Sequence, residues 1–174
     1  MYPGRSEAEA LGWQRLFSGE RWEEGIALLR GEMQRMEQAH VPALVAITGL
    51  PLVHLLLARN ELDEAQGHLP HIQPIVEPLD QYMFLTQLWW GLAKLQVARG
   101  NLLEAELFYE RILNNWKMTE DSVFILPMLL DGIMLYAGTG NRVKARQWLR
   151  ELEALVLVTG NPLPGERIAR LRRP

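Results

Sequence analysis

The chain has 174 residues, of which 48% are hydrophobic and 22% are charged, and its formal net charge is −3. This composition is typical of a globular protein, and the small negative charge argues against nucleic-acid binding, which needs a surplus of Lys and Arg. Because the sequence contains no cysteine, it excludes disulfides, thiol catalysis and Cys-ligated zinc.

In chain order, four apolar stretches suited to helices are each followed by a turn and a second, amphipathic stretch. The first helices are expected at 5–18, 42–58, 80–99 and 121–138. The second helices are expected in RWEEGIALL (21–29), NELDEAQGHLPHI (60–72), GNLLEAELFYERIL (100–113) and GNRVKARQWLREL (140–152). In the second of these, Pro70, Pro74 and Pro78 predict a short, kinked or frayed helix, since proline removes a backbone donor. The pattern predicts four helix–turn–helix units, eight helices in all.

A small residue recurs every forty residues in the second helices, as Gly25, Ala65, Ala105 and Ala145. Large apolar residues follow four positions later in each copy. They follow seven positions later in all but the first copy, where Glu32 stands. Offsets of 0, 4 and 7 form one face of a helix, so these columns predict the packed stripe of each second helix. The small residue allows the two helices of a pair to approach closely.

The turns within the units share a second signal. Gly100 and Gly140 suit the left-handed backbone that ends many helices, and the asparagine after each glycine suits the cap of the next helix. In the first two units, Glu20 and Asn60 stand in place of the glycine.

The third unit resembles a tetratricopeptide repeat through Trp89, Leu92, Ala93, Gly100, Asn101, Ala105, Tyr109 and Ile112. The period of forty is longer than the roughly 34 residues of that family. The longer unit is similar to the helical-repeat region of large bacterial signal-transducing ATPase regulators of transcription, of the maltose-activator and LuxR types. The tail VTGNPLPGER (158–167) is similar to the G-x-PLPP-x-ER segment that follows the repeats in such regulators.

The resemblance implies an all-α fold, a right-handed α-solenoid of about four antiparallel helix pairs. We expect one domain over 1–174, with repeats at about 5–40, 41–78, 79–118 and 119–158 and a tail at 159–174. In that family the repeats do no chemistry and act as a sensor or docking platform beside ATPase and DNA-binding modules. The sequence contains neither module, so we expect a fragment of such a regulator or a free-standing relative. The alternative is a structural spacer or oligomerisation module of a multidomain protein.

The resemblance also places a binding groove along the concave face of the first helices. Transferring the groove positions through the repeat register gives Gln14, His54, Lys94 and Met134, with Trp90 one turn before Lys94 and Gln87 one turn earlier still. The expected occupant is a protein or peptide partner, or a small-molecule effector. Alternatively, neighbouring helices or the second copy of a homodimer fill the groove.

Other chemical sites have weaker support. His68 and His71 form an H-x-x-H with Glu64 one turn earlier, but Pro70 distorts the spacing that metal ligation needs, so we expect no metal site. GTGNRVKAR (138–146) lacks the G-K-[ST] ending of a phosphate loop. No residues support catalysis, so we expect neither an enzyme nor a cofactor.

Two apolar stretches and both termini bear on location. The stretch 41–58 is interrupted by Pro42, Gly49 and Pro51, and 122–138 contains Asp131, which is costly in a bilayer. The N-terminus lacks the apolar region of a secretory signal. We therefore expect a cytoplasmic protein that does not enter the membrane. The basic tail RIARLRRP (167–174) favours a solvated face over a nucleic-acid contact.

Overall fold

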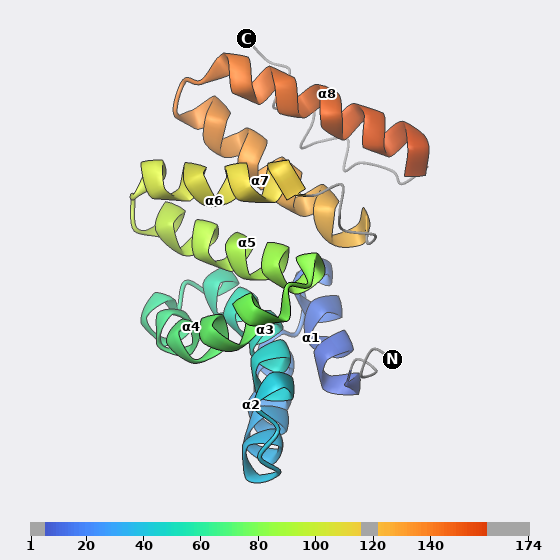
Figure 1. Cartoon of the computed structure of the whole chain (residues 1–174), viewed down its shortest axis with the longest axis vertical. Helices are drawn as coiled ribbons and strands as arrows, with labels where there is room; N and C mark the ends of the chain where they lie inside the picture. Colours follow the sequence, from blue (N-terminus) through green and yellow to red (C-terminus); the bar gives the residue numbers. More distant parts are fainter. Residues whose placement is uncertain (1–5, 116–121, 160–174) are drawn as a thin grey trace.

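A computed structural model of the protein describes residues 6–115 and 122–159, and within these ranges it contains eight α-helices, one short 3₁₀ helix and no strand (Figure 1). The all-helical prediction is therefore confirmed for this part of the chain. The helices are α1 (Glu7–Ser18), α2 (Trp22–Gln38), α3 (Pro42–Ala58), α4 (Leu62–Val76), η1 (Glu77–Leu79), α5 (Tyr82–Ala98), α6 (Leu102–Asn115), α7 (Ser122–Gly138) and α8 (Arg142–Thr159).

The helices pack in two ways. Each helix contacts the next one in the chain, so that α2, α4 and α6 each join their own pair to the following one. The first helices also contact each other in order, α1 with α3, α3 with α5, and α5 with α7. Figure 1 shows the pairs following one another along the long axis of the molecule, from α1 and α2 at one end to α7 and α8 at the other.

The left-handed turns predicted at Gly100 and Gly140 are present, and the turns of the first two pairs also contain a left-handed residue. Gly100 and Gly140 have φ angles of 78° and 80°, and Asn60 has 63°. In the first unit Gly19, with φ 71°, takes this conformation instead of Glu20. Glycine adopts a positive φ at little steric cost, so the left-handed residue of this turn lies one position earlier. The four first helices nevertheless end in register, at Ser18, Ala58, Ala98 and Gly138.

The predicted asparagine cap differs between the last two pairs. The Asn141 side-chain oxygen accepts a hydrogen bond of 3.3 Å from the backbone N–H of Lys144, which is the geometry of an N-cap. The Asn101 side-chain amide instead donates to the Gln96 side chain, at 2.8 Å.

The predicted stripe of the second helices forms the contact with the first helices. Gly25, Ala65 and Ala105 are buried, and Ala145 is half-buried. A methyl group at Gly25 would lie only 3.1 Å from Leu55 Cδ1. This close approach explains why the first unit has glycine where the other three have alanine. The large apolar residues at the two following columns are buried at Leu29, Leu69, Tyr109, Ile72, Ile112 and Leu152.

Glu32 interrupts this stripe in the sequence but still lies in the packed face. It is buried, and its carboxylate pairs with the guanidinium of Arg35 one turn later. The ion pair allows a charged residue to occupy an apolar column, because a buried carboxylate is costly without a partner.

The prolines of α4 do not shorten it. The helix runs for 15 residues with Pro70 and Pro74 inside it, and Pro78 falls in η1. The helix is therefore neither short nor frayed, and the predicted kink stays a prediction. Leu69, Ile72 and Val76 are buried on one side of α4, and their packing offsets the backbone hydrogen bonds that proline removes.

Ion pairs between successive helix pairs recur at equivalent positions. Arg59 lies 3.0 Å from Glu23, and Arg99, forty residues after Arg59, lies 3.7 Å from Asp63, forty residues after Glu23. The end of α3 thus contacts the start of α2 in the same way as the end of α5 contacts the start of α4.

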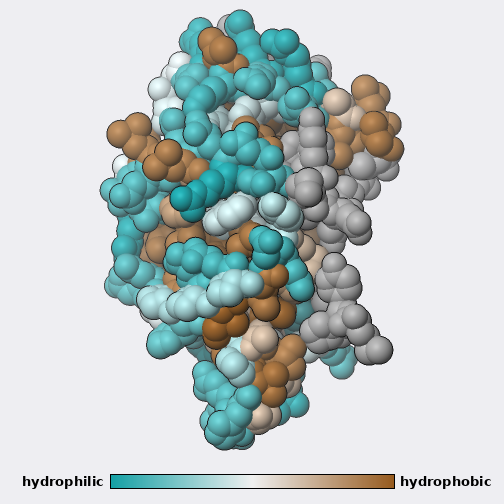
Figure 2. All heavy atoms as spheres, in the orientation of Figure 1, coloured by the Kyte–Doolittle hydropathy of each residue, from teal (hydrophilic) through white to brown (hydrophobic). Residues whose placement is uncertain are grey.

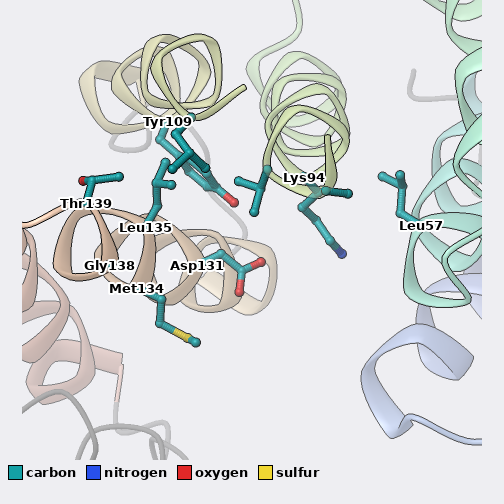
Figure 3. A pocket seen from close by; sticks show the side chains of 11 residues that line it. Leu57, Lys94, Tyr109, Asp131, Met134, Leu135, Gly138 and Thr139 are labelled. Atoms are coloured by element: carbon teal, nitrogen blue, oxygen red, sulfur yellow. The ribbon is translucent and has the colours of Figure 1, made fainter. Parts of the chain in front are cut away.

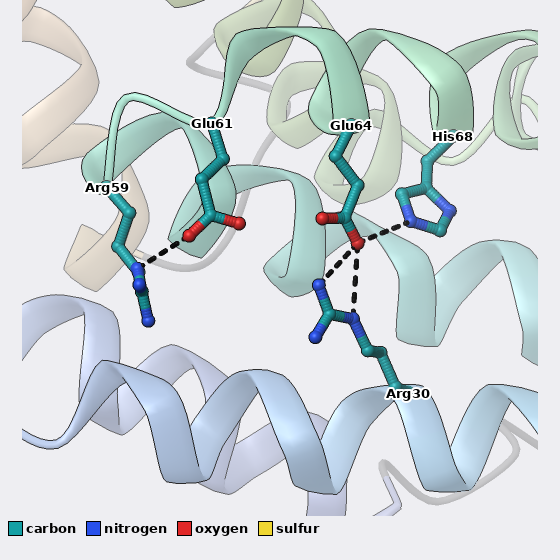
Figure 4. A network of polar contacts seen from close by, with 5 residues as sticks. All are labelled: Arg30, Arg59, Glu61, Glu64 and His68. Carbon is teal, nitrogen blue, oxygen red and sulfur yellow. Dashed lines mark hydrogen bonds and ion pairs between the residues drawn. The ribbon is translucent and has the colours of Figure 1, made fainter.

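A second ion pair recurs with its charges exchanged. Arg30 of α2 contacts Glu64 of α4 at 2.5 Å, beside His68 (Figure 4). Eighty residues later in the chain, Glu110 of α6 pairs with Lys144 of α8. The register is kept although the acid and the base have changed places.

No helix within the described ranges has both the length and the apolar character that a membrane crossing requires.

Candidate functional site

Three of the six predicted groove residues lie inside the protein. His54, Gln87 and Trp90 are 0%, 1% and 3% exposed. The His54 ring nitrogen Nε2 lies 2.9 Å from the backbone oxygen of Gln87, and the His54 and Trp90 ring centroids are 4.5 Å apart. These residues therefore form the contact between α3 and α5 rather than an open surface.

An aromatic cluster extends this contact to the outer first helices. The Trp13 ring of α1 lies 5.2 Å from His54 and 4.8 Å from Phe124 of α7, centroid to centroid. Phe17 also contacts Phe124, at 5.4 Å. Side chains of α1, α3, α5 and α7 therefore fill the space between these helices at this level.

The other three predicted residues reach the surface. Gln14 is exposed on α1, Lys94 is half-buried on α5, and Met134 is 52% exposed on α7. Lys94 and Met134 line the same cavity, whereas Gln14 is not part of it. The structure thus brings two of the six predicted residues together at one accessible place.

This cavity has a volume of about 540 Å³ and lies between α5, α6 and α7, with Leu57 of α3 on one side (Figure 3). Its walls are mainly apolar and come from the last turns of α5 and α7 and the start of α6. They include Leu57, Val97, Ala98, Leu102, Met134 and Leu135.

Four polar side chains line the cavity, namely Lys94, Tyr109, Asp131 and Thr139. In Figure 3 the hydroxyl of Tyr109 and the carboxylate of Asp131 point toward the cavity from α6 and α7, and Lys94 extends from α5. The indole N–H of Trp90 donates a hydrogen bond of 2.8 Å to Asp131 Oδ2, and Lys94 Nζ lies 4.6 Å from the centre of the Trp90 ring. Trp90 therefore holds both charged groups without lining the cavity itself.

Burial sets the protonation of two neighbouring groups. It raises the pKa of the Tyr109 hydroxyl well above 10, and the charge of Asp131 raises it further, so this hydroxyl stays a hydrogen-bond donor. Burial, with the charge of Lys94 as a smaller cause, lowers the pKa of His54 well below 6.5. His54 is therefore neutral near pH 7 and donates from Nε2 to the Gln87 carbonyl.

Neither Asp131 nor Tyr109 is among the site residues predicted from the sequence. Tyr109 falls in a column of packed residues, so its hydroxyl carried no separate signal. Asp131 did give one, because it is the single charged residue in the apolar stretch 122–138. An acid in such a stretch needs a polar partner, and here Trp90 supplies one.

Three of the exposed apolar side chains, Val97, Leu102 and Met134, line the cavity, and others lie in or near the turns of the last two helix pairs. Leu103 and Val143 are 80% and 79% exposed, and both stand where the first two pairs carry Glu23 and Asp63. We call these two residues, with Val97, Leu102, Leu107 and Met134, the apolar edge. Figure 2 shows apolar atoms among the polar ones on this face, including at the left margin near the turn between α5 and α6.

The alternative sites are placed as follows. Glu64 contacts Arg30 and lies 3.9 Å from His68, and the described residues contain no cluster of three side chains suited to a metal ion. The glycines of GTGNRVKAR form the turn between α7 and α8. Trp116, most of the tail segment 158–167 and the basic segment 167–174 lie outside the described residues.

The sequence matches no protein-family model, no curated protein and no solved structure.

Proposed function

We propose that this protein is a non-catalytic helical-repeat scaffold that recognises a protein or peptide partner through its apolar edge. The observation that carries the proposal is the change at the edge between the two halves of the chain. Glu23 and Asp63 of the first two helix pairs contact Arg59 and Arg99, whereas Leu103 and Val143 of the last two pairs leave the equivalent surface apolar and open.

Partner recognition accounts for this surface better than folding does. A side chain that is about four-fifths exposed contributes little to the core, and exposed apolar patches are typical of interaction sites. Two equivalent positions carry an aliphatic residue where the first two units carry an acid. The cavity lined by Val97, Leu102 and Met134 of the same edge offers a pocket for an anchoring side chain, the usual centre of a protein interface.

The arrangement we propose for the four pairs is a right-handed α-solenoid. The recurrence of the Arg59–Glu23 contact at Arg99–Asp63, forty residues later, supports equal stacking of successive pairs. The exchanged pairs Arg30–Glu64 and Glu110–Lys144 support it a second time. In a solenoid each unit contacts mainly its neighbours, which leaves the turns along one edge for binding.

We further propose that the scaffold serves as the sensor or docking region of a bacterial signal-transducing regulator of transcription. This part of the proposal rests on the sequence resemblance of the forty-residue unit and of the segment 158–167. It implies a partner in the same cytoplasm, either another domain of the regulator or a separate signalling protein.

The test compares partner capture by three forms of the protein. The variant Leu103→Asp/Val143→Asp places charges on the apolar edge. A matched control, Leu157→Asp/Val158→Asp, places them on two residues of α8 that are 85% and 86% exposed but lie away from the edge. We expect proteins retained by the immobilised wild type and by the control to be lost from the edge variant, with unchanged circular dichroism.

Equal retention by all three forms would reject the edge as the docking surface. Light scattering over a range of concentrations tests the alternative of an oligomerisation module. A wild-type dimer that only the edge variant dissociates would favour that alternative over a separate partner.

A further inference from the structure

We infer that the partner docked at the apolar edge is an acidic amphipathic helix, and that the start of α8 receives its carboxylates. This inference rests on the proposed function and deepens it, because it names the chemistry of the partner. The residues that carry it are Arg142, Arg146 and Arg150, which we call the arginine stripe. All three side chains are exposed.

The start of α8 differs in charge from the start of the other second helices. The segments 22–30, 62–70 and 102–110 each contain more acids than bases, whereas 142–150 contains four bases and no acid. The first turns of α2, α4 and α6 are acidic, and the first turn of α8 has no acid. The last unit therefore keeps the helices of the repeat but reverses their charge.

Folding does not account for this reversal. The N-terminal end of a helix carries a partial positive charge, so acids there stabilise the helix and bases destabilise it. Like charges four residues apart on a helix also repel each other. Lys144 is paired with Glu110 of α6, but among the described residues no acid forms an ion pair with the arginine stripe. A bound acid would offset this repulsion.

The arginine stripe and the apolar edge meet on one side of α8. Residues three, four and seven positions apart share a face of a helix, so Val143, Arg146 and Arg150 lie on the same side. Val143 belongs to the apolar edge and is 79% exposed. The stripe rises roughly 12 Å along α8, with about 6 Å between successive arginines. This surface thus combines an aliphatic contact with a row of cations.

An acidic amphipathic helix matches both parts of this surface. Carboxylates four residues apart on a helix also repeat every ~6 Å, and arginine binds a carboxylate through two parallel N–H groups. The apolar side of such a helix would cover Val143 and the equally exposed Leu103. A nucleic acid would contact the arginines but would gain little from aliphatic side chains, and the net charge of −3 opposes it.

The experiment measures the binding of fluorescent helical peptides to the whole chain by anisotropy. Three peptides share one pattern of leucines, and their remaining face carries glutamate, glutamine or lysine at positions four residues apart. We expect the glutamate peptide to bind about tenfold more tightly than the glutamine peptide at low salt, since three exposed ion pairs together give about that factor. The lysine peptide should bind most weakly, and added salt should reduce the preference for glutamate.

The stripe variant, Arg142→Gln/Arg146→Gln/Arg150→Gln, should bind the glutamate and glutamine peptides equally. It should also unfold at a temperature no lower than the wild type, because it removes the repulsion at the start of α8. A stripe variant that keeps the preference for glutamate overturns the inference. A stripe variant that is less stable than the wild type overturns it too, because the arginines would then serve the fold.

The matched control, Arg21→Gln/Arg30→Gln/Arg59→Gln, removes the same charge from exposed arginines of the first two helix pairs. It should keep the preference for glutamate, and its loss there would reduce the effect to net charge and overturn the inference. Duplex DNA that binds the wild type more tightly than the glutamate peptide would assign the stripe to nucleic acid instead. Self-association of the wild type that the stripe variant abolishes would make a second copy the occupant, again overturning the inference.

The edge variant, Leu103→Asp/Val143→Asp, separates this inference from the proposed function. It should weaken the binding of all three peptides, because it removes the aliphatic contact that they share. If the edge variant loses binding and the stripe variant keeps its preference for glutamate, the docking edge stands and the acidic partner is rejected. If the edge variant binds all three peptides like the wild type, the docking edge itself is rejected.

Discussion

The indole Nε1 of Trp90 on α5 lies 2.8 Å from the carboxylate oxygen Oδ2 of Asp131 on α7. This hydrogen bond joins the first helices of the third and fourth pairs. Its two residues are 41 positions apart, so they are nearly equivalent in the forty-residue register. It also explains why a tryptophan that is only 3% exposed can influence the accessible cavity beside it. Trp90 fixes one wall of the cavity by holding a residue of another helix.

The first prediction is that Trp90→Phe destabilises the protein by more than its lost packing alone. Phenylalanine keeps the ring but removes the donor to Asp131, and the loss of a hydrogen bond to a charged acceptor typically costs about 1–3 kcal/mol. Urea unfolding followed by circular dichroism measures the change. Trp89→Phe, at the half-buried neighbouring position, is the control, and an equal loss in both variants would contradict the prediction.

The second prediction concerns the close approach of α7 to α6 and α8. A methyl group at Gly132 would lie 2.7 Å from Trp148 Cζ3 and 3.2 Å from Tyr109 Cδ1. Both rings are almost fully buried and cannot move aside, so Gly132→Ala should lower the free energy of unfolding by about 1–3 kcal/mol.

Gly67→Ala in α4 is the matched control for this change. An added methyl group there meets no atom within 4 Å. It should raise the free energy of unfolding by about 0.4–1 kcal/mol, because alanine restricts the unfolded chain more than glycine does. Thermal unfolding that shifts in the same direction for both variants would argue against the close packing at Gly132.

The sequence was sufficient to predict the eight helices and their packed stripes because the four repeated units can be aligned with one another. A single glycine in a turn carries little information, but Gly100 and Gly140 at equivalent positions indicate a shared geometry, and both have positive φ. In the first turn the left-handed residue is Gly19, one position before Glu20, because glycine adopts this conformation at a lower cost.

The burial of the predicted groove could not be derived in the same way. A sequence repeat predicts contacts within a unit and between neighbouring units. The contact of Phe124 with Trp13 instead joins the fourth pair to the first. That contact depends on how sharply the stack of helices curves, which is set by the summed packing of several helices. His54, Gln87 and Trp90 are enclosed as a result, and only Lys94 and Met134 remain at the accessible cavity.

The third prediction uses the ion pairs with exchanged charges. Reversing both charges of the pair, as Arg30→Glu/Glu64→Arg, should restore most of the stability that either single change removes. Because both side chains are about half exposed, the coupling should be small, about 0.2–1 kcal/mol, and should weaken at high salt.

A double-mutant cycle of unfolding free energies measures this coupling. The noncognate combination Arg30→Glu/Lys144→Glu, with the two residues on α2 and α8, should be additive. Equal coupling in both combinations would point to a general effect of net charge instead of the contact between Arg30 and Glu64.

The fourth prediction is a loss of stability in mild acid that depends on His54. Burial, and then the charge of Lys94, lowers the pKa of His54 in the folded protein well below its unfolded value of 6.5. Between these two values the unfolded chain binds the proton and the folded chain does not. The free energy of unfolding is therefore highest above about pH 6.5. It falls as the pH is lowered further, by at most about 1.4 kcal/mol per pH unit for this one group.

Urea unfolding at pH 7.5, 6.5 and 5.5 for the wild type and for His54→Gln isolates this contribution. The wild type should lose more stability than the variant between pH 6.5 and 5.5, and both should change little between pH 7.5 and 6.5. His68→Gln is the control, since the pKa of His68 is also lowered by burial but its side chain is 27% exposed. If His68→Gln, and not His54→Gln, removed the loss in acid, the titrating group would lie on the surface of α4, and the neutral His54 between α3 and α5 would play no part in it.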